Sequence, residues 1–247
     1  MTALSIVSLL PRLLGNNGDA ANARILAQRL RWSGVEVTVV DVDSAAQLPD
    51  RVDAVVIGTG TDSDLVEARD DLLTLIEALR DWLAAGVPIL AVGTGWELLS
   101  WGVQLRDGTV VDGLGVVAGR AMTRAARATG DLVVTSPHGR LIGFENHARD
   151  YVGAEGSPLG RVEHGVGNGT SSGSAFEGVH SGAFIGTHLH GPVLALNPAL
   201  ADHMLSLMRS RAGLADAGAV SARVAQADDI ARAATDQILT RLGLDTA

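Results

Sequence analysis

The residues of this chain that could do chemistry centre on an elbow whose apex is a glycine. Residues 87–99 read Val-Pro-Ile-Leu-Ala-Val-Gly-Thr-Gly-Trp-Glu-Leu-Leu, which predicts a short apolar strand, a turn and an apolar helix start. Such an elbow holds one nucleophilic side chain above a parallel sheet and directs the following backbone N–H groups at a developing oxyanion. Here the apex is Gly93, which has no side chain to react.

A second group of reactive side chains lies near the end of another predicted strand, residues 183–189. His188 and His190 share one strand face because side chains alternate with period two. His190 is either a general base or a hydrogen-bonded structural residue. The two histidines also fit a metal site with Glu177 or His180 as third ligand. We predict that the chain binds neither a metal ion nor a cofactor.

Composition narrows the class of protein. The chain has 247 residues with 19 Lys+Arg against 28 Asp+Glu, and its net charge of −9 disfavours nucleic acid or an anionic membrane as partner. It contains no cysteine, which excludes disulfides, thiolate metal sites and thiol nucleophiles. No signal peptide or membrane-length apolar run is recognisable. We therefore expect a cytoplasmic protein.

The first half of the chain predicts the alternating strands and helices of a doubly wound α/β sheet. Strands are expected at residues 5–10, 35–40, 53–57 and in the elbow. A helix that follows residues 15–19 turns Ala23, Leu26 and Leu30 inward, with Asp19 as its cap. A single long helix is expected at 64–85, ending at Gly86.

The second half shows a different pattern. Short β-like runs at 109–117, 131–136 and 141–146 predict antiparallel additions to the parallel core. Residues 153–178, rich in Gly, Ser and Asn, predict a long exposed loop or a hairpin tip with little regular structure. Helices are expected at 198–208 and 221–242. We divide the chain into a main domain, residues 1–210, and a linker with a C-terminal helical extension, residues 211–247.

Residues 88–99 resemble the nucleophile elbow of class I glutamine amidotransferases of the cobyric acid synthase type, whose pattern is Pro-x-Leu-Ala-x-Cys-Gly-Gly-aromatic-Gln-Leu-Leu. Residues 17–23, 143–147, 186–192 and 197–202 resemble the glutaminase subunit (GatD-like) of lipid II isoglutaminyl synthase. The resemblance implies an α/β, flavodoxin-like sandwich with a mainly parallel central sheet, antiparallel additions and a C-terminal helix. The C-terminal helix itself lies outside the match.

The resemblance also assigns roles to single residues. Gly93 falls on the family's nucleophilic cysteine and His190 on its catalytic histidine. The loop 58–62 falls on the glycine-rich loop that supplies an oxyanion-hole N–H, with Gly58 and Gly60 at glycine positions of the family's Gly-Gly-Gly-Gln-Asp.

Three further positions belong to the same predicted pocket. Thr94 replaces the glycine after the cysteine, and Glu97 replaces the elbow's glutamine. Arg127 falls near an arginine that the family uses at the glutamine entrance. For Thr94, helix N-capping is a simpler role than catalysis, since threonine nucleophiles need a strong adjacent base. The segment Glu145-Asn146-His147 lies either by the active site or in a structural network.

Because glycine cannot supply a thiolate, we expect the isolated chain to lack glutaminase activity; loss of a nucleophile costs on the order of a million-fold in rate. The pocket is expected to keep its backbone N–H donors and bind a small amide or carboxylate ligand such as glutamine. The space that the missing thiol leaves is expected to hold a water.

In the enzyme that the chain resembles, a Mur-ligase-like partner uses ATP and the released ammonia to amidate the D-glutamate of the peptidoglycan stem, a step of cell wall biogenesis. One hypothesis is a pseudoenzyme that binds a partner or a small ligand. Another is a working subunit of a Mur-ligase-like amidating synthetase that uses free ammonia or positions the ligase. A third is a metal-dependent or other hydrolase in the remodelled pocket.

Overall fold

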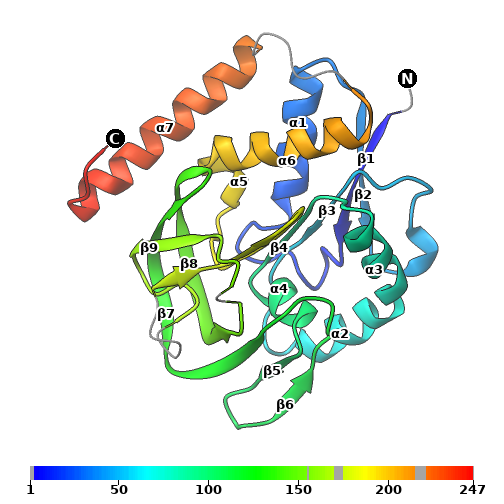
Figure 1. Cartoon of the computed structure of the whole chain (residues 1–247), viewed down its shortest axis with the longest axis vertical. Coiled ribbons are helices and arrows are strands. Elements are labelled where there is room, and N and C mark those ends of the chain that lie inside the picture. Colours follow the sequence, from blue (N-terminus) through cyan, green and yellow to red (C-terminus); the bar gives the residue numbers. More distant parts are fainter. Residues whose placement is uncertain (1–2, 155, 170–174, 215–220, 247) are drawn as a thin grey trace.

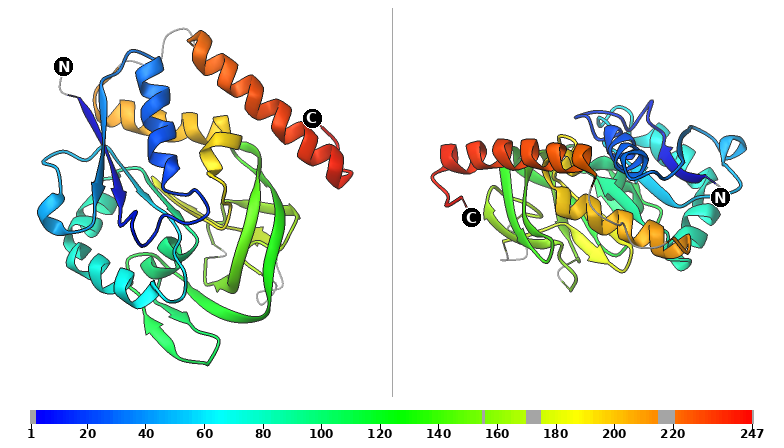
Figure 2. Two further views of the ribbon diagram at one scale, coloured as in Figure 1. Left: turned by 180° about the vertical axis from the view of Figure 1, so that it is seen from behind. Right: turned by 90° about the horizontal axis from the view of Figure 1, so that it is seen from above.

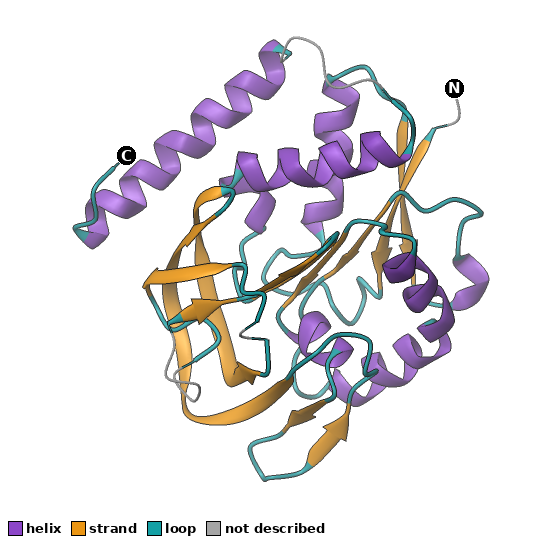
Figure 3. Ribbon diagram, in the orientation of Figure 1, coloured by secondary structure: helices purple, strands orange, loops and turns teal. Residues whose placement is uncertain are grey.

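The chain folds around a six-stranded sheet with helices on both faces, and a second sheet lies beside it (Figure 1, Figure 3). The structure is a computed structural model, and it describes residues 3–154, 156–169, 175–214 and 221–246. The strands of the first sheet lie in the order β11-β12-β4-β3-β1-β2. They are β1 (Leu4–Leu9), β2 (Val37–Val42), β3 (Ala54–Ile57), β4 (Ile89–Val92), β11 (Val179–Ser181) and β12 (Phe184–Thr187). All neighbours pair in parallel except β11, which runs antiparallel to β12.

Apolar residues on both faces of these strands explain the two helical layers. Side chains alternate along a strand, so Ile6 and Val56 join one apolar cluster while Val7 and Val55 join the other. The first cluster includes residues of α1, α5 and α6, and the second includes residues of α2, α3 and α4. The helices are α1 (Ala21–Trp32), α2 (Leu65–Thr74), α3 (Ile76–Ala84), α4 (Thr94–Leu99), α5 (Val193–Leu196) and α6 (Pro198–Arg211), with a short 3₁₀ turn at Ala45–Gln47. This confirms the predicted fold class.

The predicted antiparallel strands form a sheet of their own. Its order is β10-β9-β7-β5-β6, with β8 paired to β7 in a long hairpin. Its strands are β5 (Gly102–Gln104), β6 (Val110–Asp112), β7 (Arg120–Ser136), β8 (Gly139–Val152), β9 (Gly160–His164) and β10 (Phe176–Glu177). Of the two alternatives for 153–178, the hairpin fits the structure, because β9 and β10 pair antiparallel with each other. The expectation of little regular structure is wrong at these two strands, and β9 also pairs with β7, which is distant in sequence. Residues 155 and 170–174 of that loop lie outside the described residues.

The helix predicted at 64–85 is divided in two. It breaks at Leu75, which has φ −105° and ψ 6° and whose N–H donates to the Leu72 carbonyl. Leu75 is buried, whereas Ile76, expected on the inner face, is only partly buried. The break rotates the second segment so that Leu75 and Leu79 complete the core, which a continuous 3.6-residue stripe cannot reveal.

A long C-terminal helix, α7 (Ala222–Leu242), lies along the outside of the molecule (Figure 2). It contacts α1 and α5, and its Leu239 packs against Val133 and Ile142 of the β7–β8 hairpin. The buried Arg29 of α1 binds Asp228 of α7 at 2.6 Å. Among the described helices, none combines the length and hydropathy that a bilayer crossing requires.

Candidate functional site

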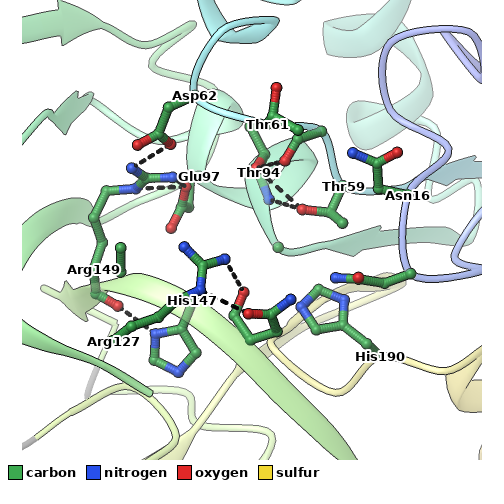
Figure 4. Close-up of a pocket in the computed structure, with 15 residues that line it drawn as sticks. Asn16, Thr59, Thr61, Asp62, Thr94, Glu97, Arg127, His147, Arg149 and His190 are labelled. Atoms are coloured by element: carbon green, nitrogen blue, oxygen red, sulfur yellow. Dashed lines mark hydrogen bonds and ion pairs between the residues drawn. The ribbon is translucent and has the colours of Figure 1, made fainter. Parts of the chain in front are cut away.

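A cavity of about 290 Å³ lies at the carboxyl ends of the parallel strands (Figure 4). Ligands of open α/β sheets bind at this edge because the loops after the strands converge there. Loops after β1, β3, β4 and β12 supply one part of the lining, and the β7–β8 hairpin supplies the other. The lining residues are Asn16, Asn17, Thr59, Gly60, Thr61, Asp62, Gly93, Thr94, Glu97, Arg127, Asn146, His147, Ala148, Arg149 and His190.

Gly93 stands at the turn between β4 and α4, as predicted. Its φ of +53° and ψ of −123° lie where L-residues are strained, and it is the N-cap of α4. Its N–H donates to the Thr187 carbonyl at 2.9 Å, and its carbonyl accepts the Glu97 N–H at 2.9 Å. The elbow therefore keeps the backbone geometry of a nucleophile turn.

The side chain of Thr59 fills the space beside this apex. A Cβ built on Gly93 would lie 2.5 Å from Thr59 Oγ1 and 2.9 Å from His190 Cε1. The expected space for a water in place of a thiol is therefore wrong, because a β-branched side chain from the neighbouring loop occupies it.

The backbone donor that follows the apex is also engaged. The Thr94 N–H donates to Thr59 Oγ1 at 2.9 Å, the Thr59 hydroxyl donates to Thr94 Oγ1 at 3.1 Å, and the Thr94 hydroxyl donates to the Gly60 carbonyl at 3.1 Å. The expectation that the elbow's N–H groups remain open is thus wrong for Thr94. Its expected capping role is wrong as well, since Thr94 is the first residue of α4 and its side chain binds the β3 loop.

His190 is paired with a carboxylate. Its Nδ1 lies 2.8 Å from Oδ2 of Asp19, and both residues are buried. Burial raises the pKa of Asp19, and the hydrogen bond with His190 opposes this rise. The other ring nitrogen, Nε2, is buried without a partner in the described part of the chain. A carboxylate that orients a histidine at an elbow is the arrangement of a catalytic triad that here has no nucleophile.

Sequence reasoning assigned Asp19 a different role. The N-cap of α1 is Ala20, with no side-chain cap, and the Asp19 carboxylate faces His190 instead. Capping propensity favours any Asp just before a helix. The signal for the observed role was its place in the loop after the first parallel strand, at the edge where the sites of such sheets assemble.

A buried ion pair forms one wall of the cavity. Arg149 Nη2 lies 2.8 Å from Oε2 of Glu97, which is 1% exposed, and Arg149 Nη1 lies 2.8 Å from Oδ1 of Asp62. Burial lowers the pKa of Arg149, but the two carboxylates outweigh it and raise the pKa above its ordinary value. Sequence reasoning missed Arg149. The signal was Glu97 itself, because a carboxylate in an apolar helix needs a cationic partner.

Arg127 brings a second cation to the cavity. Its Nε donates to Asn146 Oδ1 at 2.7 Å and its Nη2 to the Asn146 carbonyl at 3.0 Å. Its side chain is exposed, and within the described residues it forms no ion pair. The guanidinium of Arg127 is therefore available to a carboxylate, whereas that of Arg149 is already neutralised.

The segment Glu145–His147 divides between the cavity and a buried network. Glu145 accepts N–H groups from Val166 and Gly167 and lies 3.2 Å from His147 Nε2. The His147 ring stacks on His188 with centroids 4.1 Å apart. Asn146 and His147 also line the cavity, so both readings of this segment hold in part.

The alternative of a metal site at His188 and His190 does not fit the side chains. His188 Nδ1 lies 3.2 Å from Glu177 Oε2, and the backbone N–H of His188 donates to Glu177 Oε1 at 2.6 Å. Burial lowers the pKa of His188. His190 binds Asp19, and His180 lies in a different cluster, so the four candidate ligands do not converge among the described residues.

Residues 6–198 match the family model of the CobB/CobQ-like glutamine amidotransferase domain. The chain belongs to this family. The glutamine-hydrolysing lipid II isoglutaminyl synthase subunit GatD of Staphylococcus aureus (strain N315) is 31% identical over 217 residues, 87% of this chain and 88% of that protein. The same-named subunit of Streptococcus pneumoniae (strain ATCC BAA-255 / R6) is 28% identical over 208 residues, 82% and 79% of the two chains.

Solved structures support the fold of this CobB/CobQ-like domain. A crystal structure described as a glutamine amidotransferase aligns with a TM-score of 0.55 and 20% identity, covering 82% of this chain and 98% of that chain.

The predicted pocket residues of this CobB/CobQ-like chain meet in one place, with one exception. Gly60, Gly93, Thr94, Arg127 and His190 line the cavity. Gly58 does not line it; its carbonyl accepts the Gly95 N–H at 3.0 Å and so ties the β3 loop to α4. The roles of these predicted pocket residues in binding or catalysis are predictions.

Proposed function

We propose that this CobB/CobQ-like protein is a glutaminase-like subunit that does not hydrolyse glutamine. The observation that carries the proposal is the elbow itself, where Gly93 stands at the apex and Thr59 fills the adjoining space. Amide hydrolysis by this route needs a thiolate, and the chain has no cysteine. The Thr94 N–H is bound to Thr59 and is not available to an oxyanion.

In place of hydrolysis, the cavity binds a small amide or carboxylate ligand such as glutamine. Arg127 supplies a cation with no carboxylate partner among the described residues, and His190 Nε2 supplies a buried, unpaired polar atom. A carboxylate at Arg127 gains charge-assisted hydrogen bonds. The cavity volume of about 290 Å³ accommodates a ligand of amino-acid size.

The proposal extends to a partner. The relatives in S. aureus and S. pneumoniae are named as subunits of a synthase, and they match most of this chain. We infer that this chain likewise associates with a Mur-ligase-like protein in the cytoplasm and positions it, while ammonia comes from another source. Co-purification from the native host followed by mass spectrometry tests this point, and recovery of the chain without any ATP-dependent ligase contradicts it.

The catalytic part of the proposal is tested by ammonia and glutamate release from glutamine. We expect the wild-type chain to be indistinguishable from its own His190→Ala variant, with the S. aureus GatD subunit as positive control. A rate well above background that disappears in His190→Ala would show that another nucleophile operates.

Ligand binding is tested separately by calorimetry with glutamine and glutamate. We expect one site per chain and at least a tenfold weaker affinity for Arg127→Met, about 1.4 kcal/mol of binding free energy. Arg161→Met, at an exposed arginine of β9 that lines neither this cavity nor the pocket adjoining it, is the matched control. Equal affinities for the two variants contradict the assigned site.

A further inference from the structure

Outside the cavity, three histidines from distant parts of the chain face one another. His138 lies in the turn between β7 and β8, His180 in β11 and His203 in α6. One ring nitrogen of each lies within 4.8 Å of the others, and the ring centroids are 4.3 to 5.3 Å apart. None of the three lines the cavity around Gly93. The three imidazoles thus meet where a hairpin turn, an edge strand and a helix come together.

The polar atoms of this cluster lack protein partners. Nε2 of His138 and Nε2 of His203 are both buried and bind no other group among the described residues. A buried polar atom without a partner is unfavourable, so two such atoms facing one another favour a ligand that both can bind.

The chemistry of the three side chains suits a cation. Imidazole nitrogen is the commonest metal ligand that protein side chains offer, and three imidazoles face one another here.

We propose that His138, His180 and His203 bind one divalent transition-metal ion of the zinc class. Zn²⁺ takes imidazole nitrogens at about 2.0–2.1 Å, which in a tetrahedron places the nitrogens roughly 3.4 Å apart. The observed spread of up to 4.8 Å closes to this distance with about 1 Å of side-chain adjustment. All three side chains are partly exposed, so a solvent molecule completes the fourth position.

The bound ion connects three elements that otherwise belong to different parts of the fold. It ties the turn of the second sheet to β11, the antiparallel edge of the first sheet, and to α6, which packs on that sheet. The site is independent of the glutamine pocket, so it stands or falls separately from the proposed function.

The test uses the full chain without an affinity tag, stripped with a chelator and titrated calorimetrically with zinc chloride. We expect one ion per chain and a higher melting temperature in the presence of zinc. His180→Ala and His203→Ala should each weaken zinc binding by roughly 100-fold or more. Loss of a residue that only orients a metal ligand already weakens binding by about 10- to 100-fold, and loss of a ligand itself should cost at least as much. His164→Ala, at an exposed histidine of β9, should bind as the wild type does.

Cobalt chloride gives a second readout that does not depend on any variant. The visible absorption of Co²⁺ bound to the wild-type chain should show the intense bands of a tetrahedral site, and zinc should displace them. An octahedral spectrum, a stoichiometry well below one, or equal affinities in His203→Ala and wild type would each overturn the proposal.

Discussion

The side chain of Thr59 occupies the position that a side chain on Gly93 would need. A Cβ at residue 93 would lie 2.5 Å from Thr59 Oγ1 and 2.9 Å from Thr59 Cβ, closer than such atoms approach in proteins. The two residues come from different loops, after β3 and after β4, and the hydroxyl of Thr59 also accepts the N–H that follows the apex. The absence of a side chain at Gly93 and the position of the Thr59 side chain are therefore coupled.

This coupling predicts that a thiol cannot be restored by one substitution. Gly93→Cys should lower the unfolding free energy by about 1–3 kcal/mol through overpacking and backbone strain, and should give no glutaminase activity. Thr59→Gly/Gly93→Cys removes the collision with Thr59, leaving the contact with the His190 ring, and frees the Thr94 N–H. It should recover stability relative to the single variant and react with a glutamine-analogue electrophile. Chemical denaturation and labelling by mass spectrometry measure both effects; a freely reactive, stable single variant contradicts the coupling.

Removal of one partner of the buried ion pair between Glu97 and Arg149 should strongly destabilise the fold. Glu97→Ala leaves the Arg149 guanidinium buried with only the half-exposed Asp62 as partner. Breaking a buried pair in this way costs about 3–5 kcal/mol. Asp62→Ala serves as the matched control, because its loss leaves the buried pair intact and should cost under about 1 kcal/mol. Urea denaturation measures the unfolding free energy of both variants. A larger loss in Asp62→Ala than in Glu97→Ala would contradict the prediction.

The histidine cluster predicts acid sensitivity in the metal-free chain. The pKa of His138 is about 4 in the folded protein against an ordinary value of 6.5, so the unfolded state binds more protons between these values. The part of the unfolding free energy that depends on neutral His138 is fully present above about pH 6.5 and is lost as the pH drops toward 4. His138→Gln should flatten this part of the melting-temperature profile, whereas His164→Ala should leave it unchanged. A profile of the same slope in wild type and His138→Gln contradicts the assignment.

The proposed boundary near residue 210 predicts that α7 is dispensable for folding but contributes to stability. A chain of residues 1–214 loses the burial of Val224, Ala231 and Leu239, roughly 2–5 kcal/mol, and keeps both sheets. Asp228→Ala in the full chain separates out the contact with Arg29. Circular dichroism should show a cooperative but earlier melt of the shortened chain; failure of residues 1–214 to fold places α7 within the domain.

Much of the fold was predictable because its signals are local. The apolar strands, the inward stripe of Ala23, Leu26 and Leu30, and the glycine at the elbow follow from periodicity and backbone preference within a few residues. The order of these elements and the resemblance of the elbow led to the family. The break at Leu75 was not predicted because the apolar stripe continues on both sides of it.

The sequence by itself determined most strands and helices of the first sheet, the fold class and the absence of a thiol nucleophile, since each depends on residue type and local spacing. Only the tertiary structure decided which side chains meet. Asp19 faces His190, Thr59 fills the space at Gly93, and His138 joins His180 and His203. These contacts join loops and strands far apart in the chain. They depend on strand order and on the placement of the second sheet, which local patterns do not encode.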